Sequence, residues 1–413
     1  MLVSVNIKNF RSIKNEVELD LNASNDKEHP NFLIESPYCN LLSATAIYGS
    51  NATGKSNLVR GIGTLLTLVK FSFQDVSALP QLIIPFLFDN ETSKSASEFD
   101  INFIHDNIRY QYGFTADKTK IYSEWLYTFP TKKAQTLFTR DWDNETSQYN
   151  YKFGRNYKGD KTKLIGITPP TTLFLSVSGS LGQETAKLVY DWFNKLSIIG
   201  IEGIPELYTI RALEDNHISK NDVIEFLLSA DFNIADFMIN KVEFHSNQLP
   251  DNMPDPFKKL LEDNLKTGYK YDIDTNHLVN DIKYSLSYND ESSGTKRMFS
   301  YAGVVLQALK NGGVVIIDEL NNFLHPLLVR YIINLFGNAK TNPKHAQIIF
   351  TTHETSILTT DFIRRDQVWF CDKNIECSTE IYSLQEFSPR KSDNIERSYL
   401  SGRFDAIPLI KGN

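Results

Sequence analysis

Residues 49–56, with the sequence GSNATGKS, match the phosphate-binding pattern G-x-x-x-x-G-K-[ST]. Glycines let the backbone curl so that successive N–H groups point at phosphate oxygens, and the following helix start adds partial positive charge. We expect Lys55 to reach the terminal phosphates and Ser56 to bind magnesium. The expected nucleotide-binding residues are Gly49, Ser50, Asn51, Ala52, Thr53, Gly54, Lys55, Ser56 and Asn57.

A pair of carboxylates follows a second apolar run. Val314 to Ile317 is the pattern of a buried strand, and Asp318 and Glu319 come directly after it. Such runs are common, and an ordinary strand end is the alternative interpretation for an isolated one. Together with the phosphate-binding loop, the pair predicts a magnesium ligand at Asp318 and a water-polarising base at Glu319.

Two more polar segments lie near these acids in the sequence. His353 comes just after the apolar run 347–351, where an isolated histidine is more often structural. The segment 291–297, ESSGTKR, precedes a helical pattern and offers hydroxyls, a glycine and a helix N-terminus to an anion. A simple helix cap would explain this segment equally well.

The elements that must position these groups follow an α/β rhythm. We expect strands at 3–7, 16–21 and 41–48, a helix at 56–73, and later a helix at 296–309. The later half continues with a strand, a helix and a strand, at residues 314–317, 326–336 and 347–351. The two halves of the nucleotide site are therefore far apart in the sequence.

Between these halves the pattern changes twice. Residues 80–165 are rich in strand patterns, with a hairpin around Asp106 and Asn107, and predict an antiparallel lobe. Residues 180–275 are mainly helical, as at 183–196 and 221–238, and predict an inserted arm. We expect three segments, namely 1–170 with the phosphate-binding loop and β lobe, 171–280 as the helical arm, and 281–413 with the remaining motifs.

Bulk composition is that of an ordinary globular protein. The chain has 413 residues, 41% hydrophobic and 23% charged, and a formal net charge of −7 that argues against a surface coating nucleic acid throughout. Its three scattered cysteines favour a reducing cytoplasm, and no export signal or membrane-spanning run is apparent.

These motifs together resemble the ABC-type ATPases of the SMC, DNA-repair and OLD groups. The chain is most similar to AAA/ABC ATPases of prokaryotic phage defence, of the RloA, AbiL and PARIS AriA types. The resemblance covers nearly the whole chain, including IKNFRSIK, GSNATGKSN, ESSGTKR, VVIIDELNNFLHP and TTHETSIL. It implies an α/β fold, an ABC-type (SMC/OLD-like) P-loop NTPase head with an antiparallel β lobe and an inserted helical arm.

The resemblance also assigns roles. His353, about 34 residues after Glu319, would be the switch histidine that contacts the γ-phosphate. Glu319, His353 and Lys55 would then be the catalytic residues, with ATP and Mg²⁺ as cofactors. The segment 291–297 would be the signature that caps the nucleotide of another copy, so that hydrolysis is slow and depends on a dimer or higher oligomer. The signature residues acting in trans would be Ser292, Ser293, Gly294 and Thr295.

Arg11 would be near the nucleotide by the same resemblance, although a surface charge at a strand end is nearly as good an interpretation. The chain departs from its relatives in two places: Ser293 stands where glycine is common, and Asn321 and Asn322 stand where an acidic residue is common. We expect these differences to change turnover more than binding. Gln81 is a weak candidate for a Q-loop residue.

Two functions remain open from the sequence. The first is a sensor or scaffold of an anti-phage, abortive-infection system, which controls a separate effector nuclease and responds to DNA or a phage protein. Only 60 residues follow His353, too few for a Toprim nuclease domain, so we expect the nuclease to be another chain. The second is a RecF-like ATPase of DNA repair, which would bind DNA in a salt-sensitive manner.

Overall fold

A computed structural model describes residues 1–131, 133–200, 206–243, 269–390 and 393–408. The chain forms two compact units. The first contains residues 1–203 and 308–413, and the second contains residues 204–307. The division into segments 1–170, 171–280 and 281–413 stays a prediction of functional organisation.

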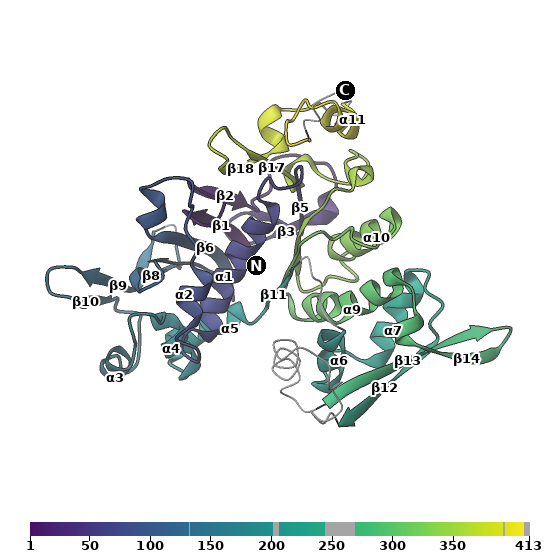
Figure 1. Ribbon diagram of the computed structural model, residues 1–413, viewed down its shortest axis with the longest axis horizontal. Coiled ribbons are helices and arrows are strands. Elements are labelled where there is room, and N and C mark those ends of the chain that lie inside the picture. Colours follow the sequence, from purple (N-terminus) through teal and green to yellow (C-terminus); the bar gives the residue numbers. More distant parts are fainter. Residues whose placement is uncertain (132, 201–205, 244–268, 391–392, 409–413) are drawn as a thin grey trace, which may run out of the picture. The chain divides into compact units, whose positions relative to one another are not determined.

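The first unit contains a seven-stranded antiparallel sheet in the order β10-β9-β8-β7-β6-β1-β2. Burial alternates along the outer strands β2 and β10, whereas the central strand β6 is buried along most of its length. Figure 1 shows the β9–β10 hairpin extending beyond the other strands. The strands are β1 (Leu2–Lys8), β2 (Val17–Asp20), β6 (Ser97–His105), β7 (Ile108–Ala116), β8 (Ile121–Phe129), β9 (Gln135–Asp143) and β10 (Gln148–Phe153).

A second, mainly parallel sheet carries the motifs, in the order β11-β15-β16-β5-β17-β18. Only β18 pairs antiparallel with its neighbour. Its central strands are continuous apolar runs because both faces are covered. The strands are β5 (Ala44–Tyr48), β11 (Leu196–Ile199), β15 (Val314–Ile317), β16 (Gln347–Thr351), β17 (Val368–Lys373) and β18 (Thr379–Ser383); β3 (Leu33–Glu35) and β4 (Asn40–Leu42) form a separate pair.

Helix α1 joins both sheets in one hydrophobic core. Its buried residues, such as Leu58 and Leu65, belong to the same cluster as Phe103 of β6 and Ile316 of β15. Trp192 stacks on Phe103 with 3.9 Å between ring centroids and closes this core from α5. The helices of the first unit are α1 (Lys55–Phe71), α2 (Ala78–Leu82), α3 (Thr162–Gly166), α4 (Phe174–Ser180), α5 (Glu184–Phe193), α10 (Pro326–Gly337) and α11 (Ile395–Leu400).

The second unit combines helices with a three-stranded antiparallel sheet, in the order β12-β13-β14. The helix expected at 221–238 ends at Ser229, and β12 begins at Asp236. Asp231 has a left-handed φ of 63°, which stops the helix, and pairing with β13 then holds the rest extended. The elements are α6 (Leu207–Glu214), α7 (Lys220–Ser229), β12 (Asp236–Glu243), β13 (Tyr269–Val279) and β14 (Ile282–Ser287), while α9 (Ser293–Asn311) runs from this unit into the first.

Most elements that carry the motifs are where the sequence predicted them. The strands at 314–317 and 347–351 have the expected bounds, and helices α1, α9 and α10 differ from expectation by a few residues at their ends. Among the described residues, no helix combines the length and hydropathy needed to span a membrane.

Candidate nucleotide-binding site

The phosphate-binding loop connects β5 to α1, as its motif requires. Lys55 is buried, and its Nζ donates to the carbonyl oxygens of Gly49 at 2.8 Å and Ser50 at 2.9 Å. The Thr53 hydroxyl also donates to Ser50 O, at 2.9 Å. These bonds turn the carbonyls of the loop toward its own side chains.

The backbone N–H groups of the same loop, unlike its carbonyl groups, form no hydrogen bonds to the loop's own side chains. No backbone N–H from Asn51 to Ser56 donates a hydrogen bond to any acceptor in the described parts of the chain. The first N–H groups of α1 lack intrahelical partners by geometry, and they adjoin the loop donors. Such a run of unpaired donors at a helix N-terminus is suited to bind phosphate oxygens.

Glycine is required at position 54 for two reasons. Gly54 has φ 113°, a left-handed conformation that side chains disfavour. A Cβ there would lie 1.9 Å from Thr379 Oγ1 and 2.8 Å from Ser12 Oγ, so neighbouring chain would have to move. The close approach shows that β18 and the loop after β1 hold the phosphate-binding loop in place.

Ser12, Cys371 and Thr379 are supporting residues that the sequence analysis missed. Thr379 donates to Thr53 O at 2.8 Å and bonds Ser12 Oγ at 2.7 Å, while Asn57 donates to Ser12 Oγ at 2.8 Å. Cys371 is buried with its Sγ 3.6 Å from Thr53 O, and burial raises its pKa to about 12. These residues are far from the loop in the sequence, so no local sequence pattern could have predicted their contacts with it.

The acid pair lies directly after β15, next to β16 in the parallel sheet. Asp318 is 2% exposed and accepts a 2.6 Å hydrogen bond from Thr351 Oγ1. The same hydroxyl oxygen accepts from the Glu319 N–H at 2.7 Å. Thr351, another residue missed from the sequence, therefore orients both acids.

Glu319 has an unusual backbone conformation. Its φ is 54°, in the left-handed region that costs a residue with a Cβ free energy unless its surroundings hold it. The bond from its N–H to Thr351 supplies such support. Strain at a half-buried carboxylate beside a phosphate-binding loop supports a functional role for Glu319.

His353 follows β16 and is held by Asn321. Asn321 Oδ1 accepts from the His353 N–H at 3.2 Å and from Thr352 Oγ1 at 2.9 Å. Asn321, which stands where the resemblance leads us to expect an acidic residue, thus positions the backbone of His353. His325, the other histidine close to the acids in sequence, instead caps α10 by accepting from the Leu327 N–H.

Electrostatic effects connect the residues expected to be catalytic. Burial lowers the pKa of Lys55, whereas Cys371, Glu319 and Asp318 act to raise it. Burial also lowers the pKa of His353, and the positive charge of Lys55 lowers it further. The structure therefore brings Lys55, Asp318, Glu319 and His353 into one electrostatic neighbourhood.

Ser56 and Asp318 supply oxygen ligands suited to Mg²⁺, a hard cation that takes phosphate oxygens and water for its remaining positions. Ser56 is half-buried at the start of α1, and one oxygen of Asp318 bonds Thr351. No group of three or more histidine, cysteine, aspartate or glutamate residues in the described chain is arranged to hold a metal alone.

Arg11 lies in the loop between β1 and β2. Its N–H donates to Ile84 O at 2.8 Å, and its Nε is buried without a partner among the described residues. Burial lowers the pKa of Arg11, and the positive charge of Arg60 acts in the same direction. Two mutually repelling guanidinium groups at this point suit an anion, and contact of Arg11 with nucleotide stays a prediction.

The signature residues begin helix α9 in the second unit. Ser292 caps the helix by accepting from the Thr295 N–H at 3.1 Å, and its hydroxyl lies 2.8 Å from Thr295 Oγ1. Ser292 and Ser293 are exposed, Gly294 is half-buried and Thr295 is buried. The helix cap is therefore present, and the role in trans stays a prediction. Gln81 lies in α2 and bonds Ser77, so no Q-loop role follows from its surroundings.

Comparison with known proteins identifies the family. Residues 44–359 match the model described as "AAA domain, putative AbiEii toxin, Type IV TA system". No curated protein sequence matches this chain.

Solved structures give weaker likenesses. An SMC head bound to the C-terminal winged-helix domain of ScpA is 14% identical, with a TM-score of 0.49 over 94% of this chain and 99% of that one. An SMC head domain from Thermotoga maritima is 12% identical, with a TM-score of 0.42 over 92% and 98%. The recombination mediator RecF with ATP is 14% identical, with a TM-score of 0.34 over 86% and 94%. The matched family spans most of the chain and both halves of the site, so this protein belongs to the AAA-domain family of putative AbiEii toxins and has a P-loop ATPase fold.

Proposed function

We propose that this protein binds ATP with Mg²⁺ and hydrolyses it to ADP and phosphate. The observation that carries the proposal is the run of unpaired N–H groups from Asn51 to Ser56, in a loop whose lysine shares an electrostatic neighbourhood with Asp318, Glu319 and His353. A triphosphate would accept from these N–H groups and give Lys55 oxygens to contact in place of the Gly49 and Ser50 carbonyls.

Each side chain has a distinct chemical task in this proposal. Mg²⁺ neutralises phosphate charge when bound, with Ser56 and Asp318 as its protein ligands. Glu319 orients a water for attack on the γ-phosphorus, and its backbone is fixed by Thr351. Neutral His353 donates its ring N–H to an oxygen of the γ-phosphate, and Asn321 holds the His353 backbone.

The proposed site is completed by a second copy of the chain. Ser292 is committed to capping α9, but Ser293 is exposed at the same helix N-terminus, where backbone N–H groups remain available to an anion. We place Ser292 to Thr295 against the nucleotide of the partner copy. Hydrolysis by an isolated copy would then be slow.

Binding tests the first part of the proposal. A fluorescent ATP analogue should bind the wild type and lose most of its affinity for Lys55→Ala, because the loop then lacks its charge. The matched control Lys344→Ala changes an exposed lysine away from the loop and should bind normally. Equal affinity for all three proteins would refute the site.

For the biological role, we propose a sensor or scaffold in an anti-phage system that controls a separate effector nuclease. The support is the sequence resemblance to phage-defence ATPases and the family description, which names a putative AbiEii toxin of a Type IV TA system. The test is plating of phages on cells that carry the gene with its neighbours. Protection should disappear with Lys55→Ala and persist with Lys344→Ala; no protection from any phage would oppose this role.

A further inference from the structure

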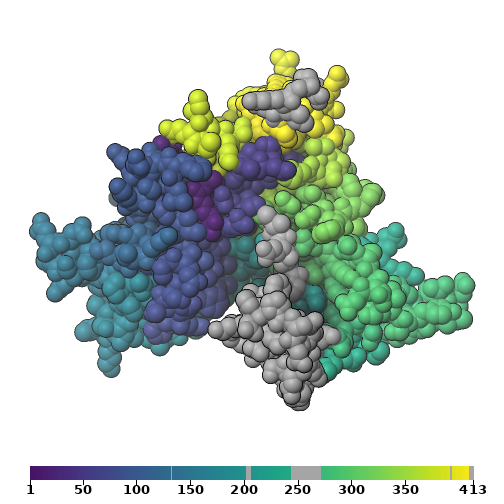
Figure 2. All heavy atoms as spheres, viewed as in Figure 1, coloured from purple at the N-terminus to yellow at the C-terminus, as the bar shows by residue number. Residues whose placement is uncertain are grey.

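A groove of about 790 Å³ lies in the first unit, where the ends of its two sheets meet. One wall comes from β2 and the loop before it, and the other comes from β17, β18 and the segment after β18. Figure 2 shows the purple-to-blue N-terminal part and the yellow C-terminal part adjoining on the visible surface. The phosphate-binding residues do not line the groove, so the proposed ATPase does not account for it.

Both walls are edges of sheets. β2 ends the seven-stranded sheet and β18 ends the six-stranded sheet, and no ladder joins them in the described chain. They are tied only at one end, where the Thr379 N–H donates to Ser12 O at 2.8 Å and the Lys14 N–H donates to Ser378 Oγ at 3.1 Å. Edge strands present unpaired backbone groups on their outer side, which is the feature that binds an extended peptide.

Five exposed carboxylates surround the groove, and none forms an ion pair within the described residues. Lys14, close to them in sequence, pairs instead with Asp89 and Glu376 at 3.3 and 2.9 Å. Like charges gathered without cations repel each other, so a cationic occupant would lower the free energy of the groove. The carboxylates are Glu16, Glu18, Glu380, Glu386 and Asp405.

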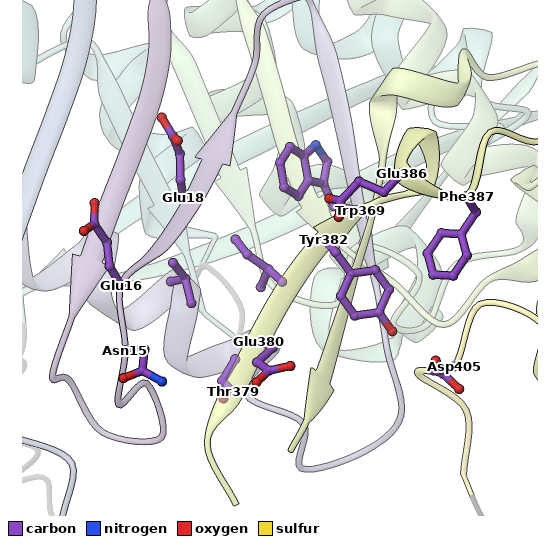
Figure 3. A pocket seen from close by; sticks show the side chains of 12 residues that line it. Asn15, Glu16, Glu18, Trp369, Thr379, Glu380, Tyr382, Glu386, Phe387 and Asp405 are labelled. Carbon is purple, nitrogen blue, oxygen red and sulfur yellow. The ribbon is translucent and has the colours of Figure 1, made fainter. Parts of the chain in front are cut away.

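Aromatic side chains form part of the lining between these charges. Figure 3 shows Trp369, Tyr382 and Phe387 on the wall opposite Glu16 and Glu18. Tyr382 is held by its hydroxyl, which donates to Phe404 O at 3.0 Å, and its ring packs against Phe387. Aromatic faces attract lysine and arginine head groups and cover their aliphatic stems.

We propose that this groove binds an extended, basic segment of a partner protein. The open edges, the carboxylates without ion pairs and the aromatic wall are three separate features that fit this one occupant. The segment pairs its backbone with the edge of β18 and places alternate lysine or arginine side chains among the carboxylates. This proposal goes beyond the ATPase and does not rest on it.

The test uses the full chain and a fluorescein-labelled peptide of alternating arginine and valine, followed by fluorescence anisotropy. The wild type should bind it saturably at physiological salt. The double variant Glu380→Lys and Glu386→Lys should weaken binding about tenfold or more, because two attractive charges become repulsive. Both residues are exposed, and circular dichroism confirms that the variant is folded.

Two controls distinguish peptide binding in the groove from general attraction of a basic peptide to an acidic protein. Glu145→Lys with Glu225→Lys makes the same change in net charge at exposed positions elsewhere, and affinity should stay within about twofold. An N-methylated form of the peptide keeps its charge but loses backbone donors, and it should bind more weakly. Equal loss in both double variants, no saturable binding, or equal affinity for the N-methylated peptide would overturn the proposal.

Discussion

At the scale of single residues, the proposed hydrolysis depends most directly on Glu319, the side chain assigned to orient the attacking water. Its carboxylate follows a strained backbone held by Thr351, so its position is set by the fold rather than by a flexible loop. Glu319→Gln keeps the shape and hydrogen bonds but removes the negative charge. We expect hydrolysis to fall by about a hundredfold or more while ATP affinity stays near that of the wild type.

Two measurements check this prediction, namely phosphate release and binding of a fluorescent ATP analogue. Asp318→Asn serves as a contrast, because losing a proposed magnesium ligand should weaken binding as well as hydrolysis. Unchanged turnover in Glu319→Gln would assign the base to another residue.

A second prediction concerns the pKa of the His353 imidazole with and without ATP. Burial and the nearby Lys55 lower its pKa below the ordinary 6.5, so the free protein should hold this imidazole neutral at pH 7. A bound triphosphate adds negative charge, which favours the protonated form and should raise the pKa. Proton NMR of the histidine ring as pH is varied checks both directions, and His353→Gln identifies the signal. A pKa that ATP does not move would place His353 away from the γ-phosphate.

At the scale of elements, local pattern was sufficient where one motif occupies one strand or helix. The apolar runs at β15 and β16 and the turn into α1 predicted that Asp318 and His353 follow strands and that Lys55 begins a helix, as the structure has them, while their roles stay predictions. Contacts between distant segments were not predictable in this way. Thr351, Thr379 and Ser12 are ordinary strand or loop residues, and only the order of strands in the sheets brings them to the acids and the loop.

The second unit shows the same limit for secondary structure. The sequence from Asn221 to Met238 has helical spacing, yet its last part becomes β12. Strand pairing is decided by a partner elsewhere, here β13, whose Asn276 pairs with Asp236. Tertiary context thus overrode local preference after Asp231.

The antiparallel lobe contains a buried carboxyl whose stability effect can be measured. Burial raises the pKa of Asp100 from 3.8 to about 6, opposed by hydrogen bonds from Trp125 Nε1 and Gln111 Nε2, each 2.9 Å. The pKa of Asp100 is higher in the folded state than in the unfolded state, so the protonated carboxyl stabilises the fold. This contribution is fully present below about pH 4 and is lost as the pH rises through about 6. Asp100→Asn should therefore raise the free energy of unfolding at pH 7 by about 3 kcal/mol and change it little at pH 4.

Urea denaturation at several pH values measures this difference. Asp143 is the matched control in the same lobe, because its pKa is shifted in the opposite direction. The hydrogen bond from the Glu145 N–H lowers the pKa of Asp143 most, and further hydrogen bonds lower it to a smaller extent. Asp143→Asn should therefore decrease stability at pH 7. A decrease with Asp100→Asn as well would show that its hydrogen bonds outweigh its burial.

At the scale of the whole molecule, the proposed site joins residues from both ends of the chain, and the signature is separate from them. The loop at Lys55 and the acids at Asp318 and Glu319 belong to one compact unit, whereas Ser293 belongs to the other. Helix α9 begins at Ser293 and ends shortly before β15. The signature and the strand that carries the acids are therefore linked in the chain by a single helix.

Mixing two inactive variants tests whether the site is shared between copies. Lys55→Ala disables the loop, and Ser293→Arg puts a bulky side chain at the exposed start of α9, so each protein alone should hydrolyse little ATP. In a mixed dimer, the intact loop of one copy faces the intact signature of the other. Random pairing puts half of the chains in mixed dimers with one complete site each, so about a quarter of wild-type activity should return.

This recovery separates a shared site from one contained within a single copy, because no arrangement within one chain lets the two defects compensate. Phosphate release from the equimolar mixture, compared with each variant at the same total concentration, is the measurement. The recovered activity should fall on dilution as the dimers dissociate. Wild-type turnover by Ser293→Arg alone would remove the signature from the site, and a mixture as inactive as its components would confine the site to one copy.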